Sequence, residues 1–281
     1  MADADQTGNP DISDEIQFSI ENNVAWITIN RPERGNALAP VHRDRLRDLI
    51  EGLNGNLEVR AAVITAAGDK MFCPRADIST DRTRPPRPEG APESSVGEAR
   101  RMMLRGQHTL MPAILDADVP IIAAVNGTAA GMGAHLALLC DLVIMAEESK
   151  FIEVFARRGL VPDALGAWIL PRLVGPMKAK ELMFFADDIP AEEALALGLC
   201  NKVVPRAELH ETAKEWAERL AVGPTKSYML TKFLVNRSLD VDRETIAQEE
   251  SWAVELNMNS LDAAEGIASF RERRSPTWRG F

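Results

Sequence analysis

Residues 119–146 read VPIIAAVNGTAAGMGAHLALLCDLVIMA, and this stretch decides the fold. Two apolar runs, 119–125 and 141–146, lack polar alternation, which is typical of strands covered on both faces. Between them a turn of small residues at 126–133 opens a short apolar helix over 134–139. A strand, a helix and a second strand in this order predict a crossover unit of a parallel sheet.

A similar pattern precedes this stretch. Ile16, Phe18 and Ile20 alternate with polar residues, and a turn separates them from a second run at 24–29, so we expect a hairpin. A helix follows, because apolar residues recur on one of its faces at helical spacing: Leu46, Leu49, Ile50 and Leu53. The run at 61–65 is again continuous and apolar, which predicts another buried strand.

The remainder of the chain is predominantly helical. Proline and charged residues at 79–98 predict a mobile surface loop, and one helix is expected over 99–117. Six further helical segments are expected at 178–186, 191–197, 206–221, 225–236, 243–257 and 261–273. We therefore predict an α/β fold in three parts: a disordered tail over 1–14, a core over 15–205 and a helical region over 206–281.

Composition excludes several classes of protein. The 281 residues are 46% hydrophobic, enough for a large core, and a net charge of −10 argues against nucleic-acid or anionic-membrane partners. Cys73, Cys140 and Cys200 are far apart and odd in number, so we expect a reducing compartment rather than disulfides. The histidines do not cluster, and no apolar run reaches about 18 residues. Neither a metal site nor a membrane span is predicted, and we expect a cytoplasmic protein.

The turn at 126–133 does not match either common nucleotide site. No Lys-Ser/Thr pair follows it, as a P-loop requires, and Leu136 stands where a dinucleotide motif has its third glycine. Gly131 and Gly133 flank Met132, so the backbone can approach a ligand and the first helical N–H groups can point at an acceptor. The alternative is a tight turn that only packs against the sheet.

A second turn, at 70–78, follows the strand at 61–65. Two turns at the ends of neighbouring strands can each supply one backbone N–H to the same oxygen. Such a pair is an oxyanion hole, which stabilises a thioester oxygen as it becomes an enolate.

Short motifs occur in a fixed order along the chain: INRP at 29–32, NAL at 36–38, FCPRADI at 72–78, PIIAAVNG at 120–127, CDL at 140–142, GLVPD at 159–163, ALALGL at 194–199 and VVP at 203–205. With them, the sequence from Ile16 to Phe281 resembles the crotonase, or enoyl-CoA hydratase/isomerase, superfamily. The resemblance implies a crotonase-like spiral of ββα turns with a helical C-terminal trimerisation region, and trimers that often pair as hexamers. It also implies an acyl-CoA thioester substrate, no prosthetic group, and oxyanion N–H donors at Ala76 and Met132.

The same resemblance implies where the coenzyme A part of the substrate binds. Its adenine is expected near 36–38, and its pantetheine along the second turn. Residues implied in these contacts are Ala37, Leu38, Pro74, Asp77 and Ile78. Arg34 and Lys70 are candidate phosphate contacts, and the alternative is that both are solvated surface charges.

The sequence departs from the family pattern at both hydratase glutamates. His135 stands at the first of these positions and Phe155 at the second. A phenyl ring cannot carry a proton, so hydration by two glutamates is not expected. Arg75 is a further departure, because the family has glycine there, and Pro74 before it lacks an N–H donor.

Asp163 is the carboxylate that remains as a candidate catalytic residue. It matches the nucleophile of 4-chlorobenzoyl-CoA dehalogenase and the acid/base aspartate of ring-oxepin isomerases. An apolar pocket formed by Phe155, Leu160, Leu165 and Trp168 would raise its pKa. The alternative role is an N-cap before a helix at 164–166.

Two other groups near this position have alternative roles. His135 is either a proton carrier in place of the first glutamate or a helix residue that partly fills the pocket. Glu153 is a third acid candidate, although its matching position is not catalytic in the family. Arg75 either distorts the first oxyanion donor or reaches a CoA phosphate.

We therefore expect an acyl-CoA enzyme of the enoyl-CoA hydratase/isomerase type, with double-bond isomerisation favoured over hydration. Its catalytic residues would be Asp163, Ala76, Met132 and His135. Three alternatives stay open: hydration by His135 with Asp163, hydrolysis or dehalogenation with Asp163 as nucleophile, and acyl-CoA binding without catalysis. The expected partners are an acyl-CoA substrate and other copies of the chain in a homotrimer or dimer of trimers.

Overall fold

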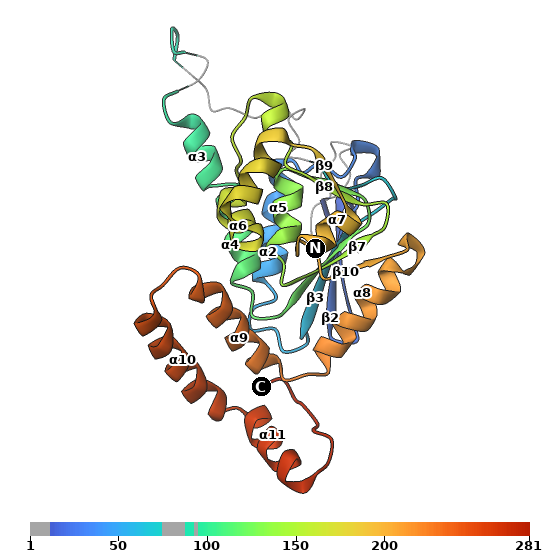
Figure 1. The fold of residues 1–281 in the computed structure, drawn as a ribbon, viewed down its shortest axis with the longest axis vertical. Coiled ribbons are helices and arrows are strands. Elements are labelled where there is room, and N and C mark those ends of the chain that lie inside the picture. The colour runs from blue at the N-terminus through green and yellow to red at the C-terminus, as the bar shows by residue number, and fades with distance from the viewer. Residues whose placement is uncertain (1–11, 75–87, 93–94) are drawn as a thin grey trace.

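The computed structural model describes residues 12–74, 88–92 and 95–281, which form two sheets surrounded by helices (Figure 1). The larger sheet has six strands in the order β1-β2-β3-β5-β7-β10. The strands are β1 (Ile16–Glu21), β2 (Val24–Ile29), β3 (Ala61–Ala66), β5 (Ile121–Val125), β7 (Leu142–Ala146) and β10 (Lys202–Val204). All pairs are parallel except β1 with β2, and this confirms the predicted hairpin and crossover units.

The hairpin turn has a clear local cause. Asn22 and Asn23 both adopt left-handed backbone conformations, with φ of 52° and 63°. Asparagine tolerates this region better than most residues, and two such residues in succession match the twist of a two-residue hairpin loop.

The smaller sheet was not predicted. It contains β4 (Met71–Cys73), β6 (Thr128–Ala130), β8 (Lys150–Ile152) and β9 (Asp188–Pro190), in the order β4-β6-β8-β9. Each strand has only three residues, which is too short for a period-of-two pattern to stand out in the sequence. Two of these strands, β4 and β6, lie within the segments 70–78 and 126–133 that were predicted as turns of the oxyanion hole.

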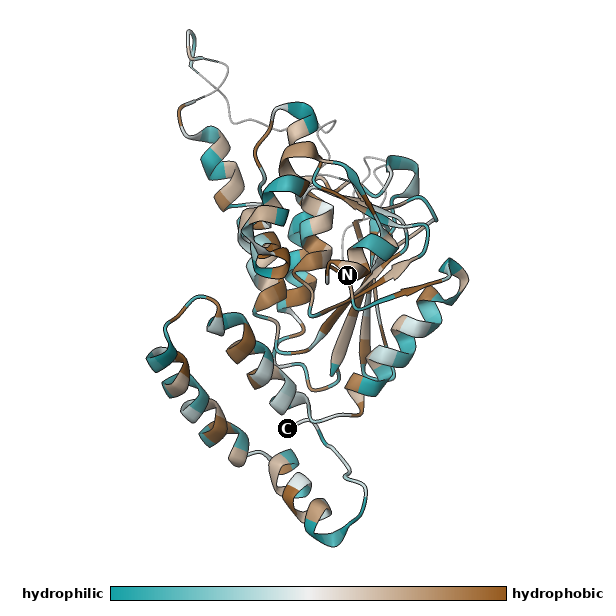
Figure 2. Ribbon diagram, in the orientation of Figure 1, coloured by the Kyte–Doolittle hydropathy of each residue, from teal (hydrophilic) through white to brown (hydrophobic). Residues whose placement is uncertain are grey.

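Helices cover both faces of the larger sheet, and Figure 2 shows the apolar strands between them. On one face, α8 (Arg206–Ala221) packs against the strands through Leu209, Ala213 and Ala217. The other helices are α1 (Ile12–Glu15), α2 (Pro40–Glu51), α3 (Glu98–Leu104), α4 (Gln107–Leu115), α5 (Met132–Leu138), α6 (Gly166–Phe185), α7 (Ala191–Ala196), α9 (Thr225–Ser238), α10 (Arg243–Met258) and α11 (Leu261–Glu272), with short 3₁₀ turns η1 (Pro32–Arg34) and η2 (Ala156–Arg158). The opposite face is filled mainly by side chains of α2, α4 and α5, including Leu46 and Leu110.

Two helix predictions were wrong in extent. The single helix expected over 99–117 is broken at Gly106, where a Cβ would lie 2.6 Å from the Met102 carbonyl oxygen. The helix expected over 178–186 matches only the second part of α6 (Gly166–Phe185), in which a non-helical backbone at Gly175 (φ 77°, ψ 160°) separates two helical segments. The first part, 166–174, was not predicted, because Pro171 lies inside it and proline usually interrupts a helix.

The predicted tail over 1–14 also ends earlier than expected. Residues 12–15 form a helical turn, and residues 1–11 lie outside the described part of the chain. Glu15 anchors this turn, because its carboxylate pairs with Arg31 at 3.2 Å and with His42. Of the loop predicted at 79–98, residues 79–87 and 93–94 lie outside the described residues, and Glu98 already belongs to α3.

The last three helices extend away from the two sheets (Figure 1). Lys232 of α9 ties them to the core, because its buried ammonium group donates to the Ile114 carbonyl and to the Asp141 carboxylate, each at 2.8 Å. These bonds satisfy a charge that would otherwise be costly to bury.

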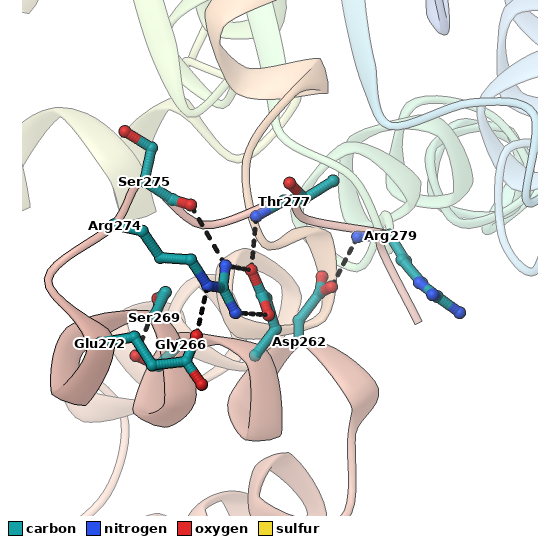
Figure 3. Close-up of polar contacts among 9 residues, drawn as sticks. Asp262, Gly266, Ser269, Glu272, Arg274, Ser275, Thr277 and Arg279 are labelled. Atoms are coloured by element: carbon teal, nitrogen blue, oxygen red, sulfur yellow. Dashed lines mark hydrogen bonds and ion pairs between the residues drawn. The ribbon is translucent and has the colours of Figure 1, made fainter.

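The C-terminal segment that follows α11 folds back along that helix (Figure 3). Arg274 forms a two-pronged ion pair with Glu265, at 2.5 and 2.8 Å, and the Thr277 N–H donates to the same carboxylate at 2.8 Å. Asp262 is buried and accepts the N–H groups of Arg279 and Gly280 at 2.6 and 2.8 Å. We call Asp262, Glu265, Arg274 and Thr277 the C-terminal clip.

The clip predicts a pH dependence of stability. The Arg274 guanidinium, helped by the Thr277 N–H, lowers the pKa of Glu265 from 4.5 to about 2. A lowered folded-state pKa adds stability that is complete above the unfolded value of 4.5 and is lost as pH falls toward about 2. The gap in melting temperature between the wild type and Glu265→Gln should therefore be constant above about pH 5 and narrow below it.

Thermal unfolding followed by circular dichroism between about pH 7 and 3 measures this gap. Glu250→Gln, a change on α10 outside the clip, serves as the control and should show no such narrowing. A gap for Glu265→Gln that stays constant to the lowest pH would contradict the role given to this ion pair.

Candidate functional site

Two turns from distant parts of the sequence meet at one point in the fold. Strand β4 pairs in parallel with β6, and α5 begins directly after β6. A Cβ on Gly133 would lie only 1.8 Å from the Cys73 carbonyl oxygen, so no other residue fits between α5 and the end of β4. The chain thus brings Pro74 and the start of α5 together, as the sequence predicted for the turns at 70–78 and 126–133.

Met132 is the first residue of α5 and is buried. An N–H at this position has no partner within its own helix, so it is available to an external acceptor. Gly131 before it is fixed by a hydrogen bond from its N–H to the Ile152 carbonyl at 2.9 Å. The other predicted donor, Ala76, lies outside the described residues, as do Arg75, Asp77 and Ile78.

His135, on the first turn of α5, forms a fully buried pair with Glu153. The two carboxylate oxygens lie 3.0 and 3.1 Å from His135 Nε2, and the residues are 0% and 2% exposed. Sequence reasoning considered both residues but did not bring them together. The reason lies in the unpredicted sheet, since pairing of Ala130 with Ile152 places Glu153 opposite the start of α5.

Two neighbours fix the imidazole of His135 in place. The ring of Phe155 lies 5.6 Å from it, at an interplanar angle of 13°. On another side, a Cβ on Gly166 would lie 1.9 Å from His135 Cε1, so only glycine fits there. His135 Nδ1 is buried and has no hydrogen-bond partner within the described part of the chain.

Asp163 lies in a strained turn just before α6. The residues after it, Ala164 and Leu165, have φ of 49° and 61°, and α6 begins at Gly166 with Leu165 as its cap residue. The alternative role of Asp163 as the N-cap is therefore wrong. Its Oδ1 atom is buried and without a partner among the described residues.

Burial raises the pKa of the Asp163 carboxyl above its ordinary value of 3.8. The imidazoles of His135 and His108 oppose this rise in pKa, and the charge of Glu153 adds to it. The expected apolar wall is only partly present, because Leu160 is 60% exposed and Trp168 donates its indole N–H to Asp240. A carboxyl with a raised pKa gives up and takes back a proton more readily near neutral pH, as acid/base catalysis requires.

The candidate CoA contacts lie along the edge formed by β4 and η1. Arg34 and Lys70 are both exposed, and the segments that carry them are joined by hydrogen bonds from the Asn36 amide to the Met71 and Ala67 carbonyls at 2.6 and 2.9 Å. Ala37 and Leu38 are buried beside this edge, and Pro74 is half-buried at the end of β4.

Two kinds of feature are absent from the described residues: a metal-binding cluster and a membrane-spanning helix. No three His, Cys, Asp or Glu side chains gather there in a way that holds a metal ion. None of the helices resolved in residues 12–74, 88–92 and 95–281 combines the length and apolar character that crossing a bilayer needs.

Comparison with known proteins connects this geometry to a family. The sequence model of the family described as "Enoyl-CoA hydratase/isomerase" matches residues 19–280. A probable enoyl-CoA hydratase of Rhodobacter capsulatus is 36% identical over 94% of this chain and 98% of its own length. The 1,2-epoxyphenylacetyl-CoA isomerase of Escherichia coli is 33% identical over the same shares of the two chains.

Solved structures give the same result. The crystal structure of an enoyl-CoA hydratase from Bacillus anthracis superposes with a TM-score of 0.85 at 31% identity, and covers 95% of this chain and 100% of that one. A putative enoyl-CoA hydratase from Streptomyces coelicolor gives a TM-score of 0.85 at 30% identity, covering 100% and 98%. These matches confirm the expected α/β crotonase fold with its C-terminal helices. The chain belongs to the enoyl-CoA hydratase/isomerase, or crotonase, family.

Proposed function

We propose that the protein isomerises the carbon–carbon double bond of an acyl-CoA thioester, with Asp163 carrying the proton. The observation that carries this proposal is the Asp163 carboxyl, which is half-buried, has a raised pKa and has an Oδ1 atom without a partner among the described residues. His135 and Phe155 stand where a two-glutamate hydratase has its carboxylates, and Glu153 is paired with His135, so Asp163 is left as the carboxylate with an unpartnered oxygen among the described residues. The 1,2-epoxyphenylacetyl-CoA isomerase of Escherichia coli shows that an acyl-CoA isomerase is among the relatives of this chain.

The reaction needs one proton to leave one carbon and return to another. With a 3-enoyl thioester, ionised Asp163 takes a proton from carbon 2, and the electron pair of the broken C–H bond spreads over the chain to the thioester oxygen as a dienolate. The N–H of Met132, together with that of Ala76, stabilises this oxygen. Protonated Asp163 then returns the proton to carbon 4, which yields the 2-enoyl thioester.

Hydration is the second candidate function. The buried His135–Glu153 pair supports it, because His135 on α5 is a proton-carrying group besides Asp163. Several relatives also carry hydratase names, among them a crotonyl-CoA hydratase from Syntrophomonas wolfei at 35% identity over 93% of this chain. The experiment below distinguishes the two reactions by their products.

We also propose that Arg34 and Lys70 bind the phosphates of coenzyme A, with Ala37, Leu38, Pro74, Asp77 and Ile78 along the path of its adenine and pantetheine. Both cations are exposed on adjoining segments, where the polyanionic end of the substrate can reach them. The buried neighbours Ala37 and Leu38 can offer backbone groups and apolar surface to the adenine.

The protein is further proposed to assemble as a trimer or a dimer of trimers. Large apolar side chains are exposed on its outer helices: Met177, Phe184 and Phe185 on α6, Trp252, Val254 and Leu256 on α10, and Phe270 on α11. Figure 2 shows apolar segments on α9 and α10, which extend away from the sheets. A monomer rarely leaves so much apolar surface in water.

Asp163→Asn should abolish isomerisation, because an amide cannot take up the carbon-bound proton. The expected loss in kcat is about 10²- to 10⁴-fold, with acyl-CoA binding retained. The assay incubates 2-enoyl- and 3-enoyl-CoA thioesters in heavy water, and mass spectrometry reads out a shifted double bond, deuterium uptake or an added water. Because ionised Asp163 is the base, the acid limb of the wild-type kcat/KM profile should lie above the pKa of an ordinary aspartate.

The matched control is Asp187→Asn, an exposed aspartate after α6, which should leave the rates unchanged. Addition of water to 2-enoyl-CoA, without any shift of the double bond in 3-enoyl-CoA, would reject isomerisation in favour of hydration. Deuterium uptake that survives in Asp163→Asn would assign the proton transfer to another residue.

Arg34→Ala combined with Lys70→Ala should raise KM for acyl-CoA by roughly fivefold, as expected for two exposed ion pairs. The same variant should show no change toward the N-acetylcysteamine thioester, which lacks the phosphates. The difference should shrink at high salt. Lys180→Ala, on the exposed side of α6, is the control, and an equal effect on both thioesters would contradict phosphate binding.

Light scattering on the purified protein should give a trimer or hexamer mass. Replacing Phe185 and Trp252 by aspartate should dissociate it, because each places a charge on an apolar surface that association removes from water. A monomeric wild type at micromolar concentration would contradict the proposed assembly.

A further inference from the structure

A cluster of three ionisable side chains plays no part in the isomerisation proposed above. Glu15, the last residue of α1, pairs with Arg31 Nε through one carboxylate oxygen, at 3.2 Å, and with His42 through the other. Arg31 and His42 are 6% and 3% exposed, so the cluster is largely out of water. We call Glu15, Arg31 and His42 the N-terminal clamp.

The clamp holds one short segment of the chain at both of its ends. Arg31 Nη1 donates to the Ala37 carbonyl, and the Ala39 N–H donates to His42 Nδ1 at 3.1 Å. Because Nδ1 is an acceptor, Nε2 carries the proton and donates to the Glu15 carboxylate. One carboxylate thereby connects the two side chains that fix the backbone at 37 and 39.

This segment depends on such contacts, because little regular structure holds it. Between β2 and α2 the chain forms the 3₁₀ turn η1, and Gly35 and Asn36 after it both have a φ of 59°. Left-handed conformations are uncommon for residues other than glycine. Asn36 is kept in this one because its side chain accepts from the Arg31 N–H at 2.9 Å and donates to the Met71 carbonyl at 2.6 Å.

Ordering a segment costs free energy when a ligand binds to it, and a segment that is already ordered avoids this cost. Ala37 and Leu38 lie within the anchored stretch, and both are buried. They are the residues proposed to lie beside the adenine of coenzyme A. The clamp therefore raises the affinity for coenzyme A without touching it.

We infer that Glu15 is a positioning residue for coenzyme A, and that it acts through Arg31 and His42 to hold residues 37–39 in the shape that receives the adenine. Burial alone would raise the pKa of the Glu15 carboxyl, but hydrogen bonds from His42 and Arg31 outweigh burial and lower that pKa below its ordinary value of 4.5. Glu15 is therefore an anion at neutral pH, and its charge offsets that of Arg31. The inference rests on the proposed path of coenzyme A and adds a residue that lies outside this path.

Binding of two saturated thioesters tests the inference without any need for turnover. Butanoyl-CoA carries the adenosine and the phosphates, and butanoyl-pantetheine lacks both. Glu15→Ala should raise the Kd for butanoyl-CoA about tenfold, as expected when one or two groups must be ordered on binding, and leave the Kd for butanoyl-pantetheine unchanged. Titration calorimetry measures both constants. A purely structural role for Glu15 would change the two constants alike.

Two further variants separate positioning from a folding defect, with thermal unfolding as the check that each is folded. Glu15→Gln keeps an oxygen that accepts from Arg31, so its loss of affinity for butanoyl-CoA should be smaller than that of Glu15→Ala. His42→Phe keeps a ring and leaves the Arg31–Glu15 pair intact. It removes the acceptor of the Ala39 N–H, so it should also weaken butanoyl-CoA binding. The matched control is Glu21→Gln, an exposed glutamate at the other end of β1, which should leave both Kd values unchanged.

An unchanged Kd for butanoyl-CoA in folded Glu15→Ala or His42→Phe would overturn the inference, and so would an equal loss for both thioesters. The double variant of Arg34→Ala with Lys70→Ala tests the proposed path of coenzyme A itself. If the double variant weakens butanoyl-CoA binding and Glu15→Ala does not, this inference alone is wrong; if neither does, the proposed path is wrong as well. Failure of the proposed isomerisation has a different signature, namely no shift of the double bond in heavy water, and it leaves these binding constants unaffected.

Discussion

The site depends on glycine at position 133, because a Cβ atom has no room there. At Gly133 the first turn of α5 lies so close to the end of β4 that a Cβ would overlap the Cys73 carbonyl. This contact sets the distance between the two segments that follow parallel strands of the smaller sheet. The positions of the Met132 amide, of His135 and of Pro74 all follow from it. Backbone packing of this kind is rigid, which is what a group that must stabilise charge in a transition state requires.

Much of the fold was predictable because the strands of the larger sheet have a clear apolar pattern in the sequence. Its central strands are continuous and predominantly apolar runs of five or six residues. In the helices between them, apolar residues recur with the period of an α-helix. The smaller sheet could not be found in this way, since three residues define no period. The same reason limited the prediction of the site. His135, Glu153 and Asp163 were each named as candidates from the sequence. The contact of His135 with Glu153 could not be predicted, because it depends on the pairing of β6 with β8. The cap proposed for Asp163 failed because Ala164 and Leu165 adopt left-handed conformations that side chains rarely choose.

The polar groups around α5 divide into two kinds. The backbone amides at its start are proposed to hold the thioester oxygen, a group that every acyl-CoA substrate has. His135, Glu153 and Asp163 differ in that they are charged or chargeable groups removed from water. Burial of Asp163 raises the pKa of its carboxyl, and His135 Nδ1 and Asp163 Oδ1 have no partners in the described chain. In the proposed function, the backbone groups hold the thioester and the side chains transfer the proton.

The turn after Asp163 shows how such a site is maintained. An alanine and a leucine in left-handed conformations each raise the energy of the folded chain by about 1–2 kcal/mol relative to an ordinary turn. The sequence of this turn does not itself favour left-handed conformations at 164 and 165. The surrounding packing maintains them, including the close contact between Gly166 of α6 and the His135 ring. Glycine at position 164 or 165 would relieve the strain and stabilise the protein, but it would also free the Asp163 backbone to move. At these two residues, a substitution that raises thermostability therefore also loosens the position of the Asp163 carboxylate.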